Sequence, residues 1–155
     1  MGEYRATVEW QAAEGQAAAD FAANRYSRAH VWRFDGGAQV PASASPQVVP
    51  LPMSDPAGVD PEEALIASAS SCHMLWFLHL ARDAGLAVAR YRDEAVGHMG
   101  RDERGRTAFT SIVLRPRIDF AGAAPDSATL ANLHHAAHDA CFIANSLRCE
   151  IAVEG

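Results

Sequence analysis

Residues 60–85 read DPEEALIASASSCHMLWFLHLARDAG and carry the clearest local signal in the chain. Asp60 is a good N-cap, and Glu63 three positions later completes a capping box. The pattern predicts a helix that ends at about Ala84, with Gly85 as its stop signal. The middle of this helix is apolar nearly all the way round, so we expect it to be buried on several sides.

Strands are expected on both sides of this helix, because apolar and polar residues alternate there. Before the helix, we predict strands at 4–10, 28–34 and 38–44, and a proline-rich ordered loop or active-site rim at 45–59. After the helix, we predict strands at 88–99 and 107–120, a second helix at 125–140, a connector at 143–147 and a strand at 148–153. This order indicates a single α+β domain over residues 1–155.

Composition and charge narrow the classes of partner. The formal net charge of -6 argues against nucleic acid and, more weakly, against an anionic membrane surface. Residues 1–11 are interrupted by charges and do not resemble a signal peptide, and the apolar stretch 74–80 is too short to span a bilayer. We therefore expect a cytoplasmic protein. Three cysteines in such a chain do not make a structural disulfide framework.

Two of the three cysteines are candidates for chemistry, although each would also fit as a buried core residue. A catalytic thiol must be a thiolate. Cys72 lies in the middle of the first long helix, out of reach of its N-terminal dipole, and needs a nearby cation. Cys141 ends the second helix, where the dipole disfavours a thiolate. If the two form a pair, Cys72 should attack and Cys141 should resolve. Cys149 is interpreted as a core residue of the last strand.

The cations available to Cys72 are Arg25, Arg28 and Arg33, although each arginine alone would also fit a solvated strand edge. Glu63 is occupied by the capping box, which leaves Glu62 free to hold an arginine.

Two alternatives remain open from the residues alone. His134, His138 and Cys141 share one helical face with ligand-like spacing for zinc, and His73 could add a fourth ligand, which would make a metal-binding module. The chain could also be a non-catalytic dimeric domain in which Cys72 and Cys141 are only core residues.

Two segments together resemble the OsmC/Ohr family of hydroperoxide reductases, which are thiol peroxidases. One is Asp60-Pro61-Glu62-Glu63-Ala64-Leu65 leading into Ser71-Cys72-His73-Met74-Leu75, and the other is Ala137-His138-Asp139-Ala140-Cys141 leading into Asn145-Ser146-Leu147. The resemblance covers the chain from about residue 28 onward. The chain departs from it at Phe142, where many members have proline.

The resemblance implies an intertwined homodimer with two long central helices wrapped by antiparallel sheets. It implies a peroxidatic Cys72, a resolving Cys141, and an arginine–glutamate pair made by Arg28, or else Arg25, with Glu62. The implied reaction reduces organic hydroperoxides to alcohols through a Cys72 sulfenic acid and a Cys72–Cys141 disulfide. No metal or organic cofactor is implied, and an external dithiol such as a lipoyl protein would reduce the disulfide.

Two further expectations concern the shape of this site. Apolar residues close in sequence to the two cysteines should supply an apolar wall for an alkyl or aryl group; they are Met74, Leu75, Trp76, Phe77, Phe142 and Ile143. Glu62 and Cys72 are ten residues apart, about 15 Å along one helix, so Glu62 is expected to serve the Cys72 of a second chain.

Overall fold

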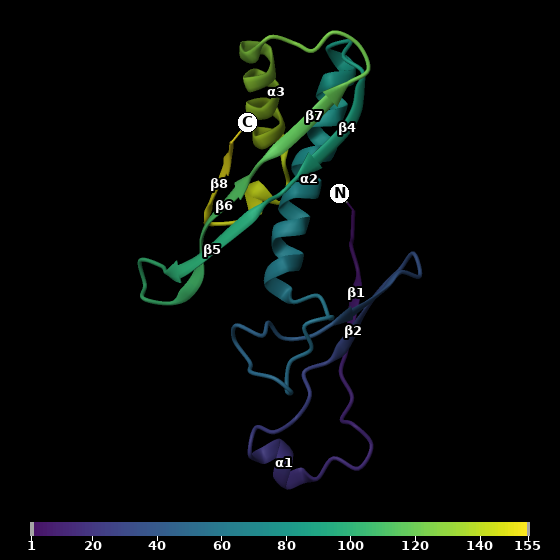
Figure 1. Cartoon of the computed structure of the whole chain (residues 1–155), viewed down its shortest axis with the longest axis vertical. Helices are drawn as coiled ribbons and strands as arrows, with labels where there is room; N and C mark the ends of the chain where they lie inside the picture. The colour runs from purple at the N-terminus through teal and green to yellow at the C-terminus, as the bar shows by residue number, and fades with distance from the viewer. Residues whose placement is uncertain (1, 155) are drawn as a thin grey trace. The chain divides into compact units, whose positions relative to one another are not determined.

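The computed structural model describes residues 2–154, and the chain divides into two compact units, Met1–Ala64 and Leu65–Gly155 (Figure 1). We call them the N-terminal and C-terminal units. Helix α2 (Pro61–Asp83) begins in the first unit and continues through the second. The prediction of one domain over residues 1–155 stays a prediction.

The N-terminal unit contains an antiparallel three-stranded sheet in the order β1-β2-β3. Its strands are β1 (Ala6–Glu9), β2 (His30–Phe34) and β3 (Gln39–Ala42), and a short helix α1 (Ala18–Ala22) lies between the first two in sequence. All three predicted strands are confirmed, each shorter than expected. The segment from 45 to 59 has no regular helix or strand, as its prolines predicted.

The capping box at the start of α2 is confirmed. The Asp60 carboxylate accepts a hydrogen bond of 2.7 Å from the Glu63 amide, and the Glu63 carboxylate accepts one of 3.3 Å from the Asp60 amide. At the other end the helix stops at Asp83, and Gly85 adopts a φ of 75° that only glycine reaches without strain.

The two long strands predicted after α2 are wrong, because each is broken into two. The four strands are β4 (Val88–Asp93), β5 (Val96–Arg101), β6 (Thr107–Leu114) and β7 (Pro116–Phe120). Strand β4 pairs with β7, and β5 pairs with β6. Two features accompany the break. The Asp93 carboxylate accepts a hydrogen bond of 2.6 Å from the amide of Arg115, 22 residues away in sequence, and Pro116 has no amide hydrogen to donate.

The chain ends with a helix, a single turn and a strand, as predicted. Helix α3 (Ser127–Ala140) is capped by the Asp126 carboxylate, which accepts a hydrogen bond of 2.7 Å from the Thr129 amide. The turn η1 (Ala144–Ser146) leads into β8 (Glu150–Val153), which pairs with β6 in parallel. This parallel pair was not predicted; it forms because the chain crosses over through β7 and α3 before returning to the sheet.

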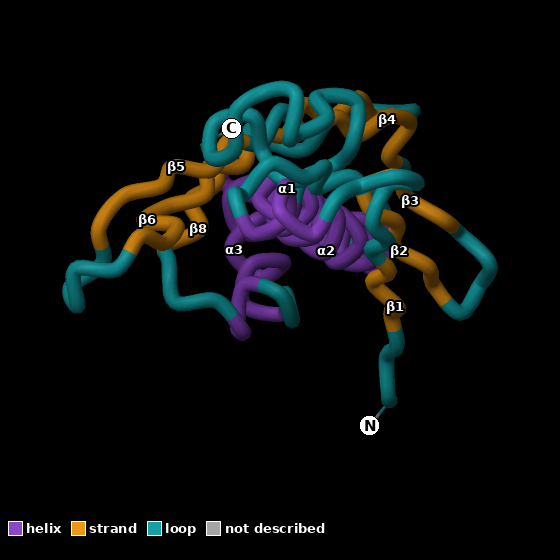
Figure 2. The backbone as a smooth tube through the Cα atoms, turned by 90° about the horizontal axis from the view of Figure 1, so that it is seen from below, coloured by secondary structure: helices purple, strands orange, loops and turns teal. Residues whose placement is uncertain are grey.

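Helix α2 is buried along one stripe of its surface, made by Ala69, His73, Phe77 and Ala81. Its first half packs on β6 and β8, and its second half packs on α3 and the β4–β7 pair (Figures 1 and 2). The strand breaks thus allow two small sheets to cover one long helix. The sequence predicted burial of this helix on several sides, but within the single chain it is fully buried only along this stripe.

The exposed positions of α2 are mixed in character and include Ala67, Leu75, His79 and Arg82. By length and composition alone α2 could cross a membrane, and 22% of its most apolar window is buried. One such helix is weak evidence for a membrane span, because the core helix of a soluble protein passes the same test.

Candidate active site

The structure brings Cys72 and Cys141 together, although 69 residues separate them in sequence. Cys72 is close enough to Cys141 to raise the pKa of its thiol, and both cysteines are free. Cys141 is 1% exposed, whereas Cys72 is half-buried and lines a hollow in the surface. The two side chains therefore form a pair of which one member is accessible and the other is enclosed.

Cys141 is held as a thiol. Burial raises its pKa above the ordinary value, and the neighbouring Cys72 thiol adds to the rise. The Ala144 amide donates to the Cys141 sulfur at 3.4 Å, which opposes the rise. Cys141 is the C-cap residue of α3, so the helix dipole also disfavours a thiolate there, as the sequence predicted.

The hollow beside Cys72 has a volume of about 320 Å³ and a mostly apolar wall. It is lined by Cys72, Leu75, Trp76, His79 and Phe142. Of the six apolar residues expected to supply the wall, Leu75, Trp76 and Phe142 do so. Phe77 is instead in the core, and Ile143 packs on the cluster around β6 and β8.

Phe142 closes one side of the hollow, and its ring meets the Trp76 ring edge to face at 5.5 Å between centroids. The position that departs from the family pattern thus contributes part of the apolar wall. The turn after Cys141 is formed nevertheless, since the Ser146 hydroxyl donates to the Phe142 carbonyl at 2.7 Å.

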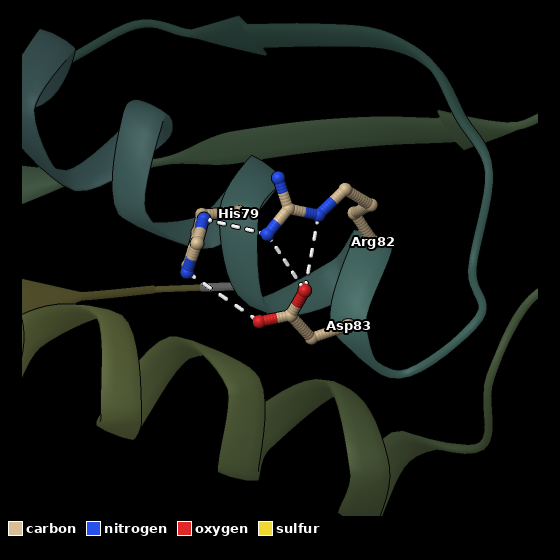
Figure 3. Close-up of polar contacts among 3 residues, drawn as sticks. All are labelled: His79, Arg82 and Asp83. Carbon is tan, nitrogen blue, oxygen red and sulfur yellow. Dashed lines mark hydrogen bonds and ion pairs between the residues drawn. The ribbon is translucent and has the colours of Figure 1, made fainter.

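His79 is the residue of the hollow that our sequence reasoning missed. The spacing of Cys72, Leu75, Trp76 and His79 is i, i+3, i+4 and i+7, so helical periodicity would have predicted it. Figure 3 shows His79 held by two neighbours on the same helix. Arg82 donates to His79 Nδ1 at 3.0 Å and to Asp83 at 2.7 Å, and Asp83 lies 3.4 Å from His79 Nε2. The bond from Arg82 places the proton of a neutral His79 on Nε2.

The predicted arginine–glutamate pair belongs to the N-terminal unit, and the two cysteines belong to the C-terminal unit. Arg28 donates to the carbonyl of Tyr26 at 2.5 Å and to the side chain of Asn24, and its guanidinium lies 3.7 Å above the Tyr26 ring. Arg25 forms an ion pair of 2.7 Å with Asp20. The roles of Arg28 and Glu62 beside Cys72 stay predictions.

The metal-site alternative gains no support from the geometry. Within residues 2–154, no three histidine, cysteine or acidic side chains are arranged to hold a metal ion. The His134 side chain is instead engaged with His73, at 3.1 Å between ring nitrogens. Cys149, the third cysteine, packs against the core cluster around β6 and β8, which fits its interpretation as a core residue.

The sequence model of the OsmC-like protein family matches residues 54–154, about two thirds of the chain and the whole of the cysteine site. The chain belongs to the OsmC-like family. An OsmC-like protein of unknown function from Vibrio cholerae is 48% identical, with a TM-score of 0.95 and 99% of each chain covered. No curated protein matches the chain.

More distant OsmC-like structures share the fold. An organic hydroperoxide resistance protein from Elizabethkingia anophelis is 17% identical, with a TM-score of 0.66 and coverage of 98% of this chain and 94% of that one. The organic hydroperoxide resistance protein OsmC from Legionella pneumophila is 14% identical, with a TM-score of 0.66 and coverage of 99% and 96%. The α+β fold and the family expected from the sequence are thus confirmed.

Proposed function

We propose that this protein is a cysteine-based peroxidase that reduces organic hydroperoxides to alcohols. The observation that carries the proposal is the proximity of an accessible Cys72 in an apolar hollow to an enclosed Cys141. Hydroperoxide resistance is also the property named for two structural relatives, from Elizabethkingia anophelis and Legionella pneumophila.

In the first step the Cys72 thiolate attacks one oxygen of the O–O bond. The sulfur is oxidised to a sulfenic acid, and the other oxygen takes a proton and leaves as the alcohol. In the second step the Cys141 sulfur attacks the sulfenic sulfur. An S–S bond forms, the S–O bond breaks, and the hydroxide leaves with the thiol proton as water.

The different roles of the two cysteines follow from their access to solvent and from the raised pKa of Cys141. A peroxide in the hollow meets Cys72, whereas Cys141 is 1% exposed. The raised pKa of Cys141 keeps it as a thiol at neutral pH, unsuited to attack a peroxide first. Once Cys72 is a sulfenic acid, Cys141 is already beside it, so the second step needs little movement.

The hollow favours a substrate with an apolar group. Leu75, Trp76 and Phe142 can cover an alkyl or aryl group, and burial of that group would contribute about 1–3 kcal/mol. Hydrogen peroxide has no such group to bury. The substrate class is therefore organic hydroperoxides rather than hydrogen peroxide.

The active site is proposed to be completed by a second copy of the chain. Glu62 lies ten residues before Cys72 on α2, about 15 Å along the helix axis, too far for one glutamate to anchor an arginine beside that thiol. An antiparallel partner helix would bring its Glu62, with Arg28, toward Cys72 and would make each contact twice. It would also cover apolar surface that a single chain leaves open on α2, such as Leu75 at 61% exposed.

The Cys72–Cys141 disulfide is proposed to be reduced by an external dithiol, such as a lipoyl protein, through thiol–disulfide exchange. A reducing cytoplasmic compartment would supply such a donor. The reaction as written uses only the two sulfurs, the peroxide and the dithiol.

The proposal is tested by turnover with cumene hydroperoxide and with hydrogen peroxide, each with a lipoamide recycling system. We expect sustained turnover with the organic peroxide. If neither peroxide oxidises any cysteine at neutral pH, the chain is the non-catalytic domain that the sequence left open. The shared site is tested by mixing Cys72→Ser chains with Glu62→Ala chains. Activity should return at about one site per heterodimer, and no return despite subunit exchange would place Glu62 in its own chain's site or outside it.

A further inference from the structure

Two histidines are buried together between α2 and α3, next to the cysteine pair. His73 is 1% exposed and His134 is 8% exposed. His73 Nε2 lies 3.1 Å from His134 Nδ1, and the two rings are nearly parallel, at 8°. Phe77 stacks on His134 at 4.6 Å between centroids. His73 Nδ1 is buried and has no hydrogen-bond partner among the described residues.

This pair is an unexpected choice for a helix–helix contact. Two apolar side chains of similar size would pack there without the cost of removing polar nitrogens from water. The hydrogen bond offsets that cost only while the two nitrogens meet. A shift of α3 along α2 would leave both imidazoles buried and unpaired, so the pair favours one register of the two helices.

That register is also the one that brings the two sulfurs together. His73 directly follows Cys72 on α2, and His134 precedes Cys141 on α3 by seven residues. Seven residues are close to two helical turns, so His134 and Cys141 lie on nearly the same face of α3. Because both helices are stiff over such short spans, a shift at the histidines would also separate the Cys141 thiol from Cys72.

We propose that His73 and His134 are positioning residues for the disulfide step, acting through the helix register that their mutual hydrogen bond fixes. The inference rests on the proposed peroxidase function and refines it. The histidines touch neither peroxide nor sulfenic acid in this account. Their effect is to keep Cys141 beside Cys72, so that a new sulfenic acid meets a thiol before it meets a second peroxide.

The competition between those two fates gives the test. After the first oxidation, Cys72 either forms the disulfide, with loss of water, or is oxidised by a second peroxide to the sulfinic acid. Intact mass spectrometry of the full-length protein, treated with increasing cumene hydroperoxide without reductant, gives the ratio of the two rate constants. Both fates start from the same Cys72 sulfenic acid. The ratio is therefore unchanged if a variant yields less folded protein, provided that only folded molecules react.

Three variants and a control define the expected result. His73→Leu removes the hydrogen bond and should lower the ratio about five- to tenfold, the change that corresponds to one buried hydrogen bond. His73→Gln retains a polar atom at a similar reach and should keep most of the ratio. His73→Leu combined with His134→Leu leaves no unpaired imidazole, so it should fold even if the single variant does not, and its ratio should still be low. His135→Leu, at an exposed position of α3, should match the wild type.

Two results would overturn the inference. One is a wild-type ratio in every folded leucine variant, and the other is an equal fall in His73→Gln and His73→Leu, which would assign the effect to packing alone. Failure of the proposed function looks different, because Cys72 of the wild-type protein would then stay unoxidised. A wild-type protein that forms the disulfide normally leaves the function standing whichever way the histidine variants behave.

Discussion

Cys72 and Cys141 are chemically the same side chain in two different surroundings. Cys72 lies in the middle of α2, half-buried, at the wall of an apolar hollow. Cys141 caps the end of α3, is 1% exposed and has a raised pKa because it is buried. Access to solvent therefore differs between two neighbouring sulfurs. The difference shows how two neighbouring thiols can take different steps of one oxidation, with Cys72 accessible to the substrate and Cys141 placed to form the disulfide afterwards.

The largest effect is expected from the accessible thiol. Cys72→Ser should reduce peroxide turnover to the uncatalysed background, because serine is no nucleophile for this step at neutral pH. Turnover of cumene hydroperoxide with lipoamide recycling measures it. Cys149→Ser is the matched control and should retain most activity, since Cys149 packs against the core cluster around β6 and β8 and does not line the hollow beside Cys72. Residual turnover in Cys72→Ser that is lost on further replacement of Cys141 would reverse the two roles.

Replacing the enclosed thiol should have a different signature. Cys141→Ser should still consume about one peroxide per chain and then stop, because Cys72 is oxidised but finds no resolving thiol. Mass spectrometry should find sulfinic acid accumulating at Cys72 with excess peroxide. A Cys141→Ser protein that turns over continuously without over-oxidation would contradict the assignment of Cys141.

The contact between His73 on α2 and His134 on α3 should weaken in acid. Burial, and then the nearby His134 and His138, lower the pKa of His73 to about 4, while Asp93 acts in the opposite direction. The unfolded chain binds this proton more readily, so stability should be full above pH ~6.5 and fall as the pH drops toward 4, by up to about 3 kcal/mol.

Urea unfolding at pH 7.5 and pH 5 measures this loss. The protein with leucine at both 73 and 134 should lose less stability between the two pH values than the wild type. His135→Leu should behave like the wild type, because His135 is exposed. An equal pH dependence in all three proteins would show that the buried pair does not titrate as inferred.

A smaller effect is expected from the wall of the hollow. Leu75→Ala should lower kcat/KM for cumene hydroperoxide about fivefold, corresponding to about 1 kcal/mol of lost apolar contact. The value for hydrogen peroxide should change little, since that substrate has no apolar group. Equal losses for both peroxides would indicate that Leu75 supports the site without contacting the substrate.

Sequence reasoning succeeded where the cause of structure is local. The capping box of Asp60 and Glu63 and the stop at Gly85 depend on neighbouring residues, and all three positions behave as predicted. The prediction of two long strands was wrong because the break at Asp93 depends on a hydrogen bond from Arg115, which is 22 residues away. Nothing in the alternation of either segment signals that contact.

The site was predictable in part for the same reason. The two cysteines were candidates from their positions on the helices and from the family motifs, and Leu75 and Trp76 were expected in the wall because they are close to Cys72 in sequence. Helical spacing would also have found His79. The His73–His134 contact was not predictable, because it depends on how α2 packs against α3. Both residues were instead assigned to a possible metal site, since spacing along one helix cannot reveal a partner on another.

The central claim is that Cys72 and Cys141 form a disulfide when an organic hydroperoxide is reduced. One equivalent of cumene hydroperoxide, added to the reduced protein and followed by alkylation and peptide mapping under non-reducing conditions, tests it directly. The account predicts that Cys72 and Cys141 appear as one disulfide-linked peptide pair, with Cys149 alkylated. Three alkylated cysteines, or a disulfide that includes Cys149, would contradict it.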